Sequence, residues 1–148
     1  MKPVKDVLEE KGYDIWTIDP DAFVFDAIKL MAEKGVGALL VLKGEKLFGI
    51  VSERDYTRKV ILKGKSSQKT LVKDIMTEEV ISADVDYDIK KCMVLMTTKG
   101  IRHLPIKQEE KLVGIVSLGD LVKTIIAEQE SKIRDFEKHF EYRSDLLH

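Results

Sequence analysis

The chain of 148 residues contains one phrase twice. Residues 49–59 read GIVSERDYTRK, and residues 114–124, which start 65 positions later, read GIVSLGDLVKT. Laying residues 16–60 over residues 81–125 without a gap gives 15 identical pairs out of 45. Self-similarity of this length at a fixed offset indicates a tandem duplication, so the chain is expected to fold as two copies of one small unit.

Each copy carries one amphipathic helix. Apolar residues recur at positions i, i+3, i+4 and i+7, which is the spacing of one helix face. They are Val24, Ala27, Ile28 and Met31 in the first copy and Ile89, Cys92, Met93 and Met96 in the second. Aspartates precede both segments, and Gly35 and Gly100 follow them, as is typical of helix starts and helix ends. Cys92 lies on the apolar face, so we interpret it as a core residue and not as a nucleophile.

Short apolar runs after each of these glycines predict pairs of strands. They lie at 38–42 and 47–51 in the first copy and at 103–106 and 112–116 in the second. Short first strands are expected at 17–18 and 80–82, and second helices at about 53–63 and 119–129. The fold class is therefore α/β of the α+β type, with two tandem β-α-β-β-α units. Pro105 has no backbone N–H, so its strand is expected to be interrupted or to lie at a sheet edge.

The composition is that of an ordinary folded domain. It is 44 % hydrophobic and 34 % charged, and 25 basic against 26 acidic side chains give a net charge of −1. Such a balance provides no basic field for nucleic acid. No apolar run is long enough to span a membrane, and the first residues lack the features of a signal peptide. One cysteine and three histidines without metal-ligand spacing predict neither an internal disulfide nor a metal site.

The Ser-x-x-Asp part of the repeated phrase supports two interpretations. Ser52 with Asp55, or Ser117 with Asp120, can form a capping box at a helix start, where the cap is worth about 1 kcal/mol. The same geometry can bind a nucleotide, because free N–H groups attract an anion and a carboxylate can accept both hydroxyls of a ribose. The two interpretations are not exclusive.

The ordered pattern of the chain resembles a pair of CBS domains, or Bateman module, as in free-standing two-domain CBS proteins. The resemblance rests on VKDIMT at 72–77, KGIRHLPI at 99–106 and both GIVSxxD segments. It implies one CBS domain at 1–64, a linker at 65–71, a second CBS domain at 72–128 and a C-terminal helical extension at 129–148. It further implies two copies packed about a pseudo-two-fold axis, with adenosine-containing ligands bound in clefts between them.

The resemblance also assigns residues to the clefts. The main cleft is expected to combine Ser52, Arg54, Asp55, Arg58, Ile81, Ser82, Ile101, Arg102, His103 and Pro105. Three guanidinium groups would suit phosphate, Asp55 would bind ribose, and adenine could approach near Pro105. A second cleft, poorer in cations and expected to be empty or weaker, would combine Thr17, Gly37, Ala38, Ser117, Asp120 and Lys123. Taken as isolated residues, these arginines are better interpreted as solvated or paired with acids such as Glu53, and only their predicted convergence favours a ligand site.

The leading functional prediction is a regulatory, non-enzymatic module that senses an adenine nucleotide and signals to an unknown partner protein. AMP is the first choice of ligand, followed by ADP or ATP, NAD(H) and S-adenosylmethionine. An enzyme is a second hypothesis, although no nucleophile with a base can be placed. A structural dimer with vestigial clefts is a third. The expected location is the cytoplasm, or an organelle matrix in a eukaryote, with no membrane or nucleic-acid partner.

The C-terminal segment is expected to mediate self-association. Residues 119–143 predict one long helix that carries Leu121, Ile125, Ile126, Ile133, Phe136 and Phe140 among many charges. An exposed helix with such residues normally needs a partner surface. We therefore expect this helix to close a homodimer.

Overall fold

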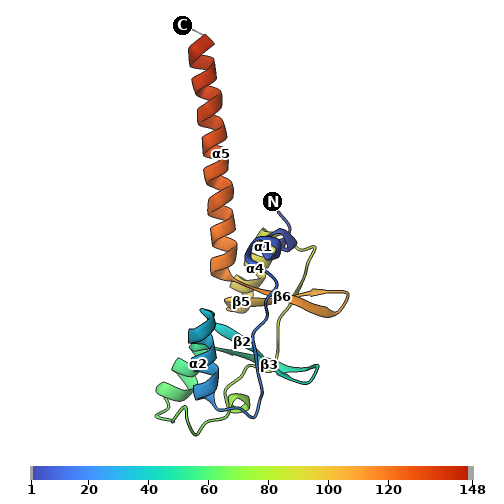
Figure 1. Ribbon diagram of the computed structural model, residues 1–148, viewed down its shortest axis with the longest axis vertical. Coiled ribbons are helices and arrows are strands. Elements are labelled where there is room, and N and C mark those ends of the chain that lie inside the picture. Colours follow the sequence, from blue (N-terminus) through green and yellow to red (C-terminus); the bar gives the residue numbers. More distant parts are fainter. Residues whose placement is uncertain (1, 147–148) are drawn as a thin grey trace. The chain divides into compact units, whose positions relative to one another are not determined.

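The computed structural model describes residues 2–146, with side chains described as far as residue 139. The chain divides into two compact units, each with its own small sheet (Figure 1). The first unit is Tyr13–Ser82, and the second unit joins Met1–Gly12 to Ala83–His148. None of the described helices is both long enough and apolar enough to cross a lipid bilayer.

The first unit has the predicted β-α-β-β-α order. Its elements are β1 (Thr17–Ile18), α2 (Val24–Lys34), β2 (Ala38–Lys43), β3 (Lys46–Ser52), α3 (Glu53–Tyr56), the π-helical turn η1 (Thr57–Ile61) and the 3-10 turn η2 (Val72–Asp74). The sheet order is β1-β2-β3, with β1 parallel and β3 antiparallel to β2. α3 and η1 together cover 53–61 of the second helix that was predicted at about 53–63.

The second unit repeats this order, with α1 added before it and with a longer last helix, α5. Its elements are α1 (Val4–Lys11), β4 (Ala83–Asp84), α4 (Ile89–Lys99), β5 (His103–Gln108), β6 (Lys111–Ser117) and α5 (Leu118–Leu146). The sheet order is β4-β5-β6. α5 packs on α1 and α4, and its buried residues Leu121 and Thr124 lie in its first two turns. The rest of this long helix extends beyond the other elements of its unit (Figure 1).

The two sheets have the same register at an offset of 65 residues. Ala38 pairs with Ser52, and His103 pairs with Ser117. The irregularity between Val41 and Leu42 likewise recurs between Ile106 and Lys107. Because even a local departure from regular pairing is duplicated, the tandem repeat predicted from sequence is confirmed in the fold.

The first strand of the second copy begins later than predicted. The expected strand at 80–82 is wrong, since β4 is Ala83–Asp84. In the first copy, Leu40 N donates a hydrogen bond to Trp16 O at 3.3 Å. The residue 65 positions after Leu40 is Pro105, which has no N–H to donate. Pairing of β4 with β5 therefore starts one residue further along, at Ala83 with Ile106.

Pro105 lies in a central strand, which corrects the expectation of an edge or an interrupted strand. β5 is continuous from His103 to Gln108 and lies between β4 and β6. Pro105 pairs with Ile115 on the β6 side. A proline is tolerated there because β4 pairs only beyond it, so no ladder bond on that side requires its missing N–H.

The core of each unit contains the residues that the helical spacing selected. In the first unit, Val24, Ala27 and Met31 of α2 are buried against Leu39, Val41 and Val51 of the sheet. In the second unit, the α4 residues Ile89, Cys92 and Met96 are buried. Burial, with Asp88 adding to it, raises the pKa of the Cys92 thiol to about 11. Cys92 is thus a core residue whose thiol stays protonated at neutral pH.

Each compact unit includes a short segment that lies outside the aligned repeats at 16–60 and 81–125. Residues 4–11 read VKDVLEEK and residues 72–79 read VKDIMTEE. The first segment, as α1, belongs to the second unit, and the second segment belongs to the first unit. A Cβ at Gly114 would meet the Leu8 side chain, and a Cβ at Gly49 would meet Met76 and Thr77. The boundaries of the compact units, after Gly12 and after Ser82, therefore differ from the expected sequence division at 1–64, 65–71, 72–128 and 129–148.

Candidate functional site

The Ser-x-x-Asp of the first copy forms a complete capping box. Ser52 is the last residue of β3 and the N-cap of α3. Asp55 N donates to Ser52 Oγ at 3.2 Å, and Ser52 N donates to Asp55 Oδ2 at 2.9 Å. The Ser52 hydroxyl also donates to Asp55 Oδ2 at 3.1 Å. The structural interpretation of the phrase is therefore confirmed, and it fixes the direction of the Asp55 carboxylate.

Lys59 holds the other oxygen of this carboxylate. Its Nζ lies 3.1 Å from Asp55 Oδ1 and donates to the carbonyl O of Ile75 at 2.8 Å. The Asp55 side chain is only 13 % exposed, so it is an ordered and mostly enclosed anion. Arg54 and Arg58 are exposed on the same helical segment. The first copy thus combines an oriented carboxylate with two guanidinium groups within one turn.

The second copy builds the same box at the start of α5. Asp120 N donates to Ser117 Oγ at 3.1 Å, and Ser117 N donates to Asp120 Oδ2 at 2.8 Å. The Thr124 hydroxyl donates to Asp120 O at 3.2 Å. Thr124 occupies the position of Lys59, so the second copy lacks the equivalent of the lysine that pairs with the carboxylate in the first copy.

Lys11 of α1 supplies that lysine instead, and sequence reasoning missed it. Its Nζ lies 2.9 Å from Asp120 Oδ2 and donates to Ile115 O at 2.7 Å. Burial alone would raise the pKa of Asp120, but the hydrogen bonds from Lys11 and Ser117 hold it below its usual value. The similarity of 4–11 to 72–79 could have marked α1 as part of the duplicated unit, yet it does not predict which copy α1 joins.

In each copy, the residue before the central strand, β2 or β5, is hydrogen-bonded to the first residue of the helix that follows the capping serine. Glu53 N donates to Gly37 O at 3.0 Å, and Leu118 N donates to Arg102 O at 2.8 Å. His103, which pairs with Ser117, is partly buried. Burial lowers the pKa of His103 below its usual value, Lys11 and Arg102 add to the lowering, and Asp120 opposes it. In the second unit, the charges of Lys11, Arg102 and Asp120 therefore all act on His103.

The residues predicted for the clefts are distributed over both units. Ser52, Arg54, Asp55, Arg58, Ile81, Ser82, Thr17, Gly37 and Ala38 belong to the first unit. Ile101, Arg102, His103, Pro105, Ser117, Asp120 and Lys123 belong to the second. Each unit brings its own strand residues close to its own Ser-x-x-Asp. The expected grouping of Arg102 and His103 with Ser52 and Asp55 stays a prediction.

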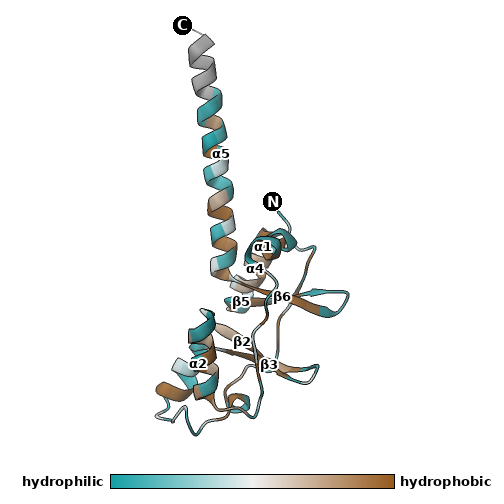
Figure 2. Cartoon of the chain, viewed as in Figure 1, coloured by the Kyte–Doolittle hydropathy of each residue, from teal (hydrophilic) through white to brown (hydrophobic). Residues whose placement is uncertain are grey.

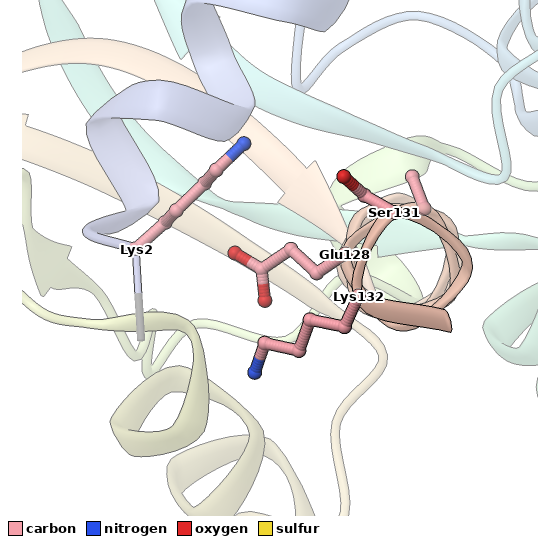
Figure 3. A pocket seen from close by; sticks show the side chains of 5 residues that line it. Lys2, Glu128, Ser131 and Lys132 are labelled. Atoms are coloured by element: carbon pink, nitrogen blue, oxygen red, sulfur yellow. The ribbon is translucent and has the colours of Figure 1, made fainter. Parts of the chain in front are cut away.

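A separate hollow of about 580 Å³ in the second unit contains none of the predicted site residues. It is lined by Lys2, Ala127, Glu128, Ser131 and Lys132. Figure 3 shows the Glu128 and Lys132 side chains extending from the same side of α5, with Lys2 opposite. Within the described part of the chain, no three His, Cys, Asp or Glu side chains are grouped to hold a metal ion. The Ser-x-x-Asp boxes therefore remain the candidate site.

Comparison with known proteins connects these boxes to a family. The model of the CBS domain matches residues 4–61 and 72–127. A mitochondrial CBS domain-containing protein of Arabidopsis thaliana, CBSX3, is 40 % identical over 141 residues, which cover 88 % of this chain and 68 % of the relative. The solved structure of a protein with CBS domains from Burkholderia ambifaria is 48 % identical, with a TM-score of 0.83 over 86 % of this chain and 96 % of that one.

One more distant structure contains ligands. It is a CBS domain pair in complex with 5′-methylthioadenosine and S-adenosyl-L-methionine. It is 23 % identical to this chain, with a TM-score of 0.76 over 86 % of this chain and 98 % of that one. At that identity the likeness concerns the fold.

Proposed function

The chain belongs to the CBS-domain family, and from that premise we propose that it is a regulatory module that binds AMP or a related adenosyl ligand. Binding would shift the population of conformations, and a partner protein would respond to the shift. The observation that carries the proposal is the capping box of the first copy, which holds the Asp55 carboxylate oriented by Ser52 and Lys59.

The chemistry of this carboxylate suits a ribose. Two hydroxyl donors of a ribose can bond to the two oxygens of a carboxylate that is already fixed, so little orientation entropy is lost on binding. Lys59 is 44 % exposed and can turn towards solvent when a hydroxyl takes its place at Asp55 Oδ1. Arg54 and Arg58 offer charge for a phosphate group. Roles for Arg102, His103, Ile81, Ser82, Ile101 and Pro105 in the same ligand site belong to the proposal.

AMP is the first candidate ligand, before ADP, ATP, NAD(H) and S-adenosylmethionine. The related CBS pair with bound methylthioadenosine and S-adenosylmethionine supports an adenosyl group as the common element. Thermal-shift measurements with this panel test the proposal, because a ligand that binds only the folded state raises the melting temperature by mass action. A shift that follows AMP concentration is expected. No shift with any adenosyl compound would contradict ligand binding and favour a structural role.

A second candidate function, self-association, is favoured by the exposed side chains of α5. Val122, Ile126, Ile133 and Phe136, which we call the α5 stripe, are 38 %, 52 %, 56 % and 71 % exposed. Figure 2 shows such hydrophobic positions separated by hydrophilic ones along α5. Phe140 continues the spacing but lies beyond the described side chains. Successive separations of four, seven and three residues place the α5 stripe on one helix face, as in a coiled-coil seam.

We propose that the α5 stripe packs on the same helix of a second copy and closes a homodimer. Sedimentation of the full chain and of a version that ends at Glu128 tests this. The full chain should sediment as a dimer and the shortened one as a monomer. A shortened chain that remains dimeric would exclude α5 as the main contact.

The proposal does not include an enzymatic activity. The relatives compared above are CBS-domain proteins, and the titratable groups of the boxes are engaged in capping and in ion pairs. We propose a role in the cytoplasm or an organelle matrix, the latter in keeping with the mitochondrial name of the Arabidopsis relative.

A further inference from the structure

Lys11 connects α1 to the second copy at two points. Its Nζ donates to Ile115 O at 2.7 Å and lies 2.9 Å from Asp120 Oδ2. The Lys11 and Asp120 side chains are 30 % and 21 % exposed, so the pair is partly enclosed. One ammonium group thus ties the end of α1 to both β6 and the start of α5.

The contact with Ile115 takes the place of a backbone hydrogen bond. In the first copy the equivalent residue is Ile50, whose carbonyl accepts from Thr77 N at 2.9 Å. In the second copy the Ile115 carbonyl accepts from the Lys11 ammonium instead. Lys11 therefore completes the outer edge of β6, and its removal would leave this carbonyl without that donor.

The lysines of the two copies differ in what their release would move. Lys59 is on the same helical segment as Asp55, four residues along, so its departure from Asp55 separates no second helix from that carboxylate, although Lys59 also donates to Ile75 O. Lys11 is on α1, which is more than 100 residues from Asp120 in sequence and is held in the unit by buried Val4, Val7 and Leu8. Departure of Lys11 from Asp120 would loosen the C-terminal end of α1.

We propose that Lys11 is a ligand-responsive latch: its ammonium competes with the hydroxyls of an adenosyl ligand for Asp120, and ligand binding there releases the end of α1. The latch rests on the proposed function, since the competing ligand is the one proposed above. Coupling of this kind is reciprocal, so Lys11 lowers the affinity of the second copy by the same factor by which ligand weakens the docking of α1.

Titration calorimetry of the full chain with AMP tests the competition. Lys11→Met should bind AMP at Asp120 about fivefold more tightly than the unmodified chain, the low end of typical coupling factors because the pair is partly exposed. Lys5→Met, an exposed lysine on the same helix, is the matched control and should behave as the unmodified chain. The gain should vanish in the double variant Lys11→Met, Asp120→Ala. Unchanged binding by Lys11→Met would overturn the latch, because Lys11 would then not compete with AMP. Weaker binding would overturn it too, because Lys11 would then contribute to binding, for example as a phosphate ligand.

Amide hydrogen exchange of residues 8–12 tests the release. Without nucleotide, exchange there should be about fivefold faster in Lys11→Met than in Lys5→Met, and saturating AMP should accelerate it in the unmodified chain. Equal exchange in both variants would overturn the latch. If AMP binds the unmodified chain but Lys11→Met changes neither affinity nor exchange, the latch fails alone. If AMP binds none of these proteins, the proposed function fails, and the latch fails with it because it requires that ligand.

Discussion

Gly49 lies directly against the backbone of Thr77. A Cβ at position 49 would be 2.5 Å from Thr77 O, and Ile50 exchanges two hydrogen bonds with Thr77, at 3.0 and 2.9 Å. Gly49→Ala must therefore displace backbone and break at least one of these bonds. We expect the free energy of unfolding, measured with denaturant, to fall by about 2–3 kcal/mol.

Gly114→Ala is the matched variant in the second copy. Its Cβ would be 2.7 Å from Leu8 Cδ2, which is the far end of a side chain rather than backbone. Leu8 is buried, so overpacking still costs about 1–2 kcal/mol. The prediction is contradicted if Gly114→Ala destabilises the chain as much as Gly49→Ala or more.

The turn between β5 and β6 contains removable strain. Glu109 and Glu110 have φ of 51° and 65°, whereas the turn of the first copy has Gly44 at φ 62°. A left-handed conformation costs a residue with a side chain about 1–2 kcal/mol. Glycine removes this cost, but the greater conformational entropy of its unfolded chain offsets part of the gain in stability. Glu109→Gly should therefore raise the free energy of unfolding by about 0.5–1 kcal/mol. The mirror variant Gly44→Ala should lower it, and a loss of stability in Glu109→Gly would refute the strain.

Sequence predicted the elements that depend on local pattern. Helix spacing, the glycine helix ends and the strand pairs were found because each depends on neighbours in the chain, and the offset of 65 residues allowed one copy to check the other. The Ser52–Asp55 box also depends on residues close in sequence, so the cap, one of the two interpretations of the phrase, is confirmed.

The errors concern relationships between distant segments. The site of Lys11 could not be predicted because α1 joins the second copy, and no local signal specifies that choice. The strand of Pro105 was expected to be interrupted or to lie at an edge, because a central strand normally needs every N–H. The structure shows that only the pairing with β4 moved, by one residue. The joint role of Arg102 and Asp55 depends on residues of both units and remains a prediction.

His103 should make stability depend on pH. Burial, Lys11 and Arg102 lower its folded-state pKa below the unfolded value of about 6.5, although Asp120 opposes this. The unfolded chain therefore takes up the proton first as pH falls below that value. Stability should decline from there down through the folded pKa, by at most about 1.4 kcal/mol per pH unit.

Denaturant unfolding at several pH values between about 5 and 7 measures this dependence. His103→Gln should reduce the slope in that range, with His139→Gln, at an exposed position of α5, as the control. The same slope in His103→Gln as in the unmodified chain would show that another group is responsible.

The most direct test of the proposed function is the affinity for AMP of three proteins, measured by titration calorimetry: the unmodified chain, Asp55→Ala and Asp120→Ala. Loss of hydrogen bonds to a charged group is worth about 1.5–3 kcal/mol, so Asp55→Ala should weaken binding about 10- to 100-fold. Asp120→Ala should weaken it less, because the second cleft is poorer in cations: Gly119 and Lys123 stand where the first copy has Arg54 and Arg58. Circular dichroism should show both variants folded. If Asp120→Ala weakens AMP binding and Asp55→Ala does not, the main site has been assigned to the wrong copy. Undiminished AMP binding by both variants would contradict the proposal.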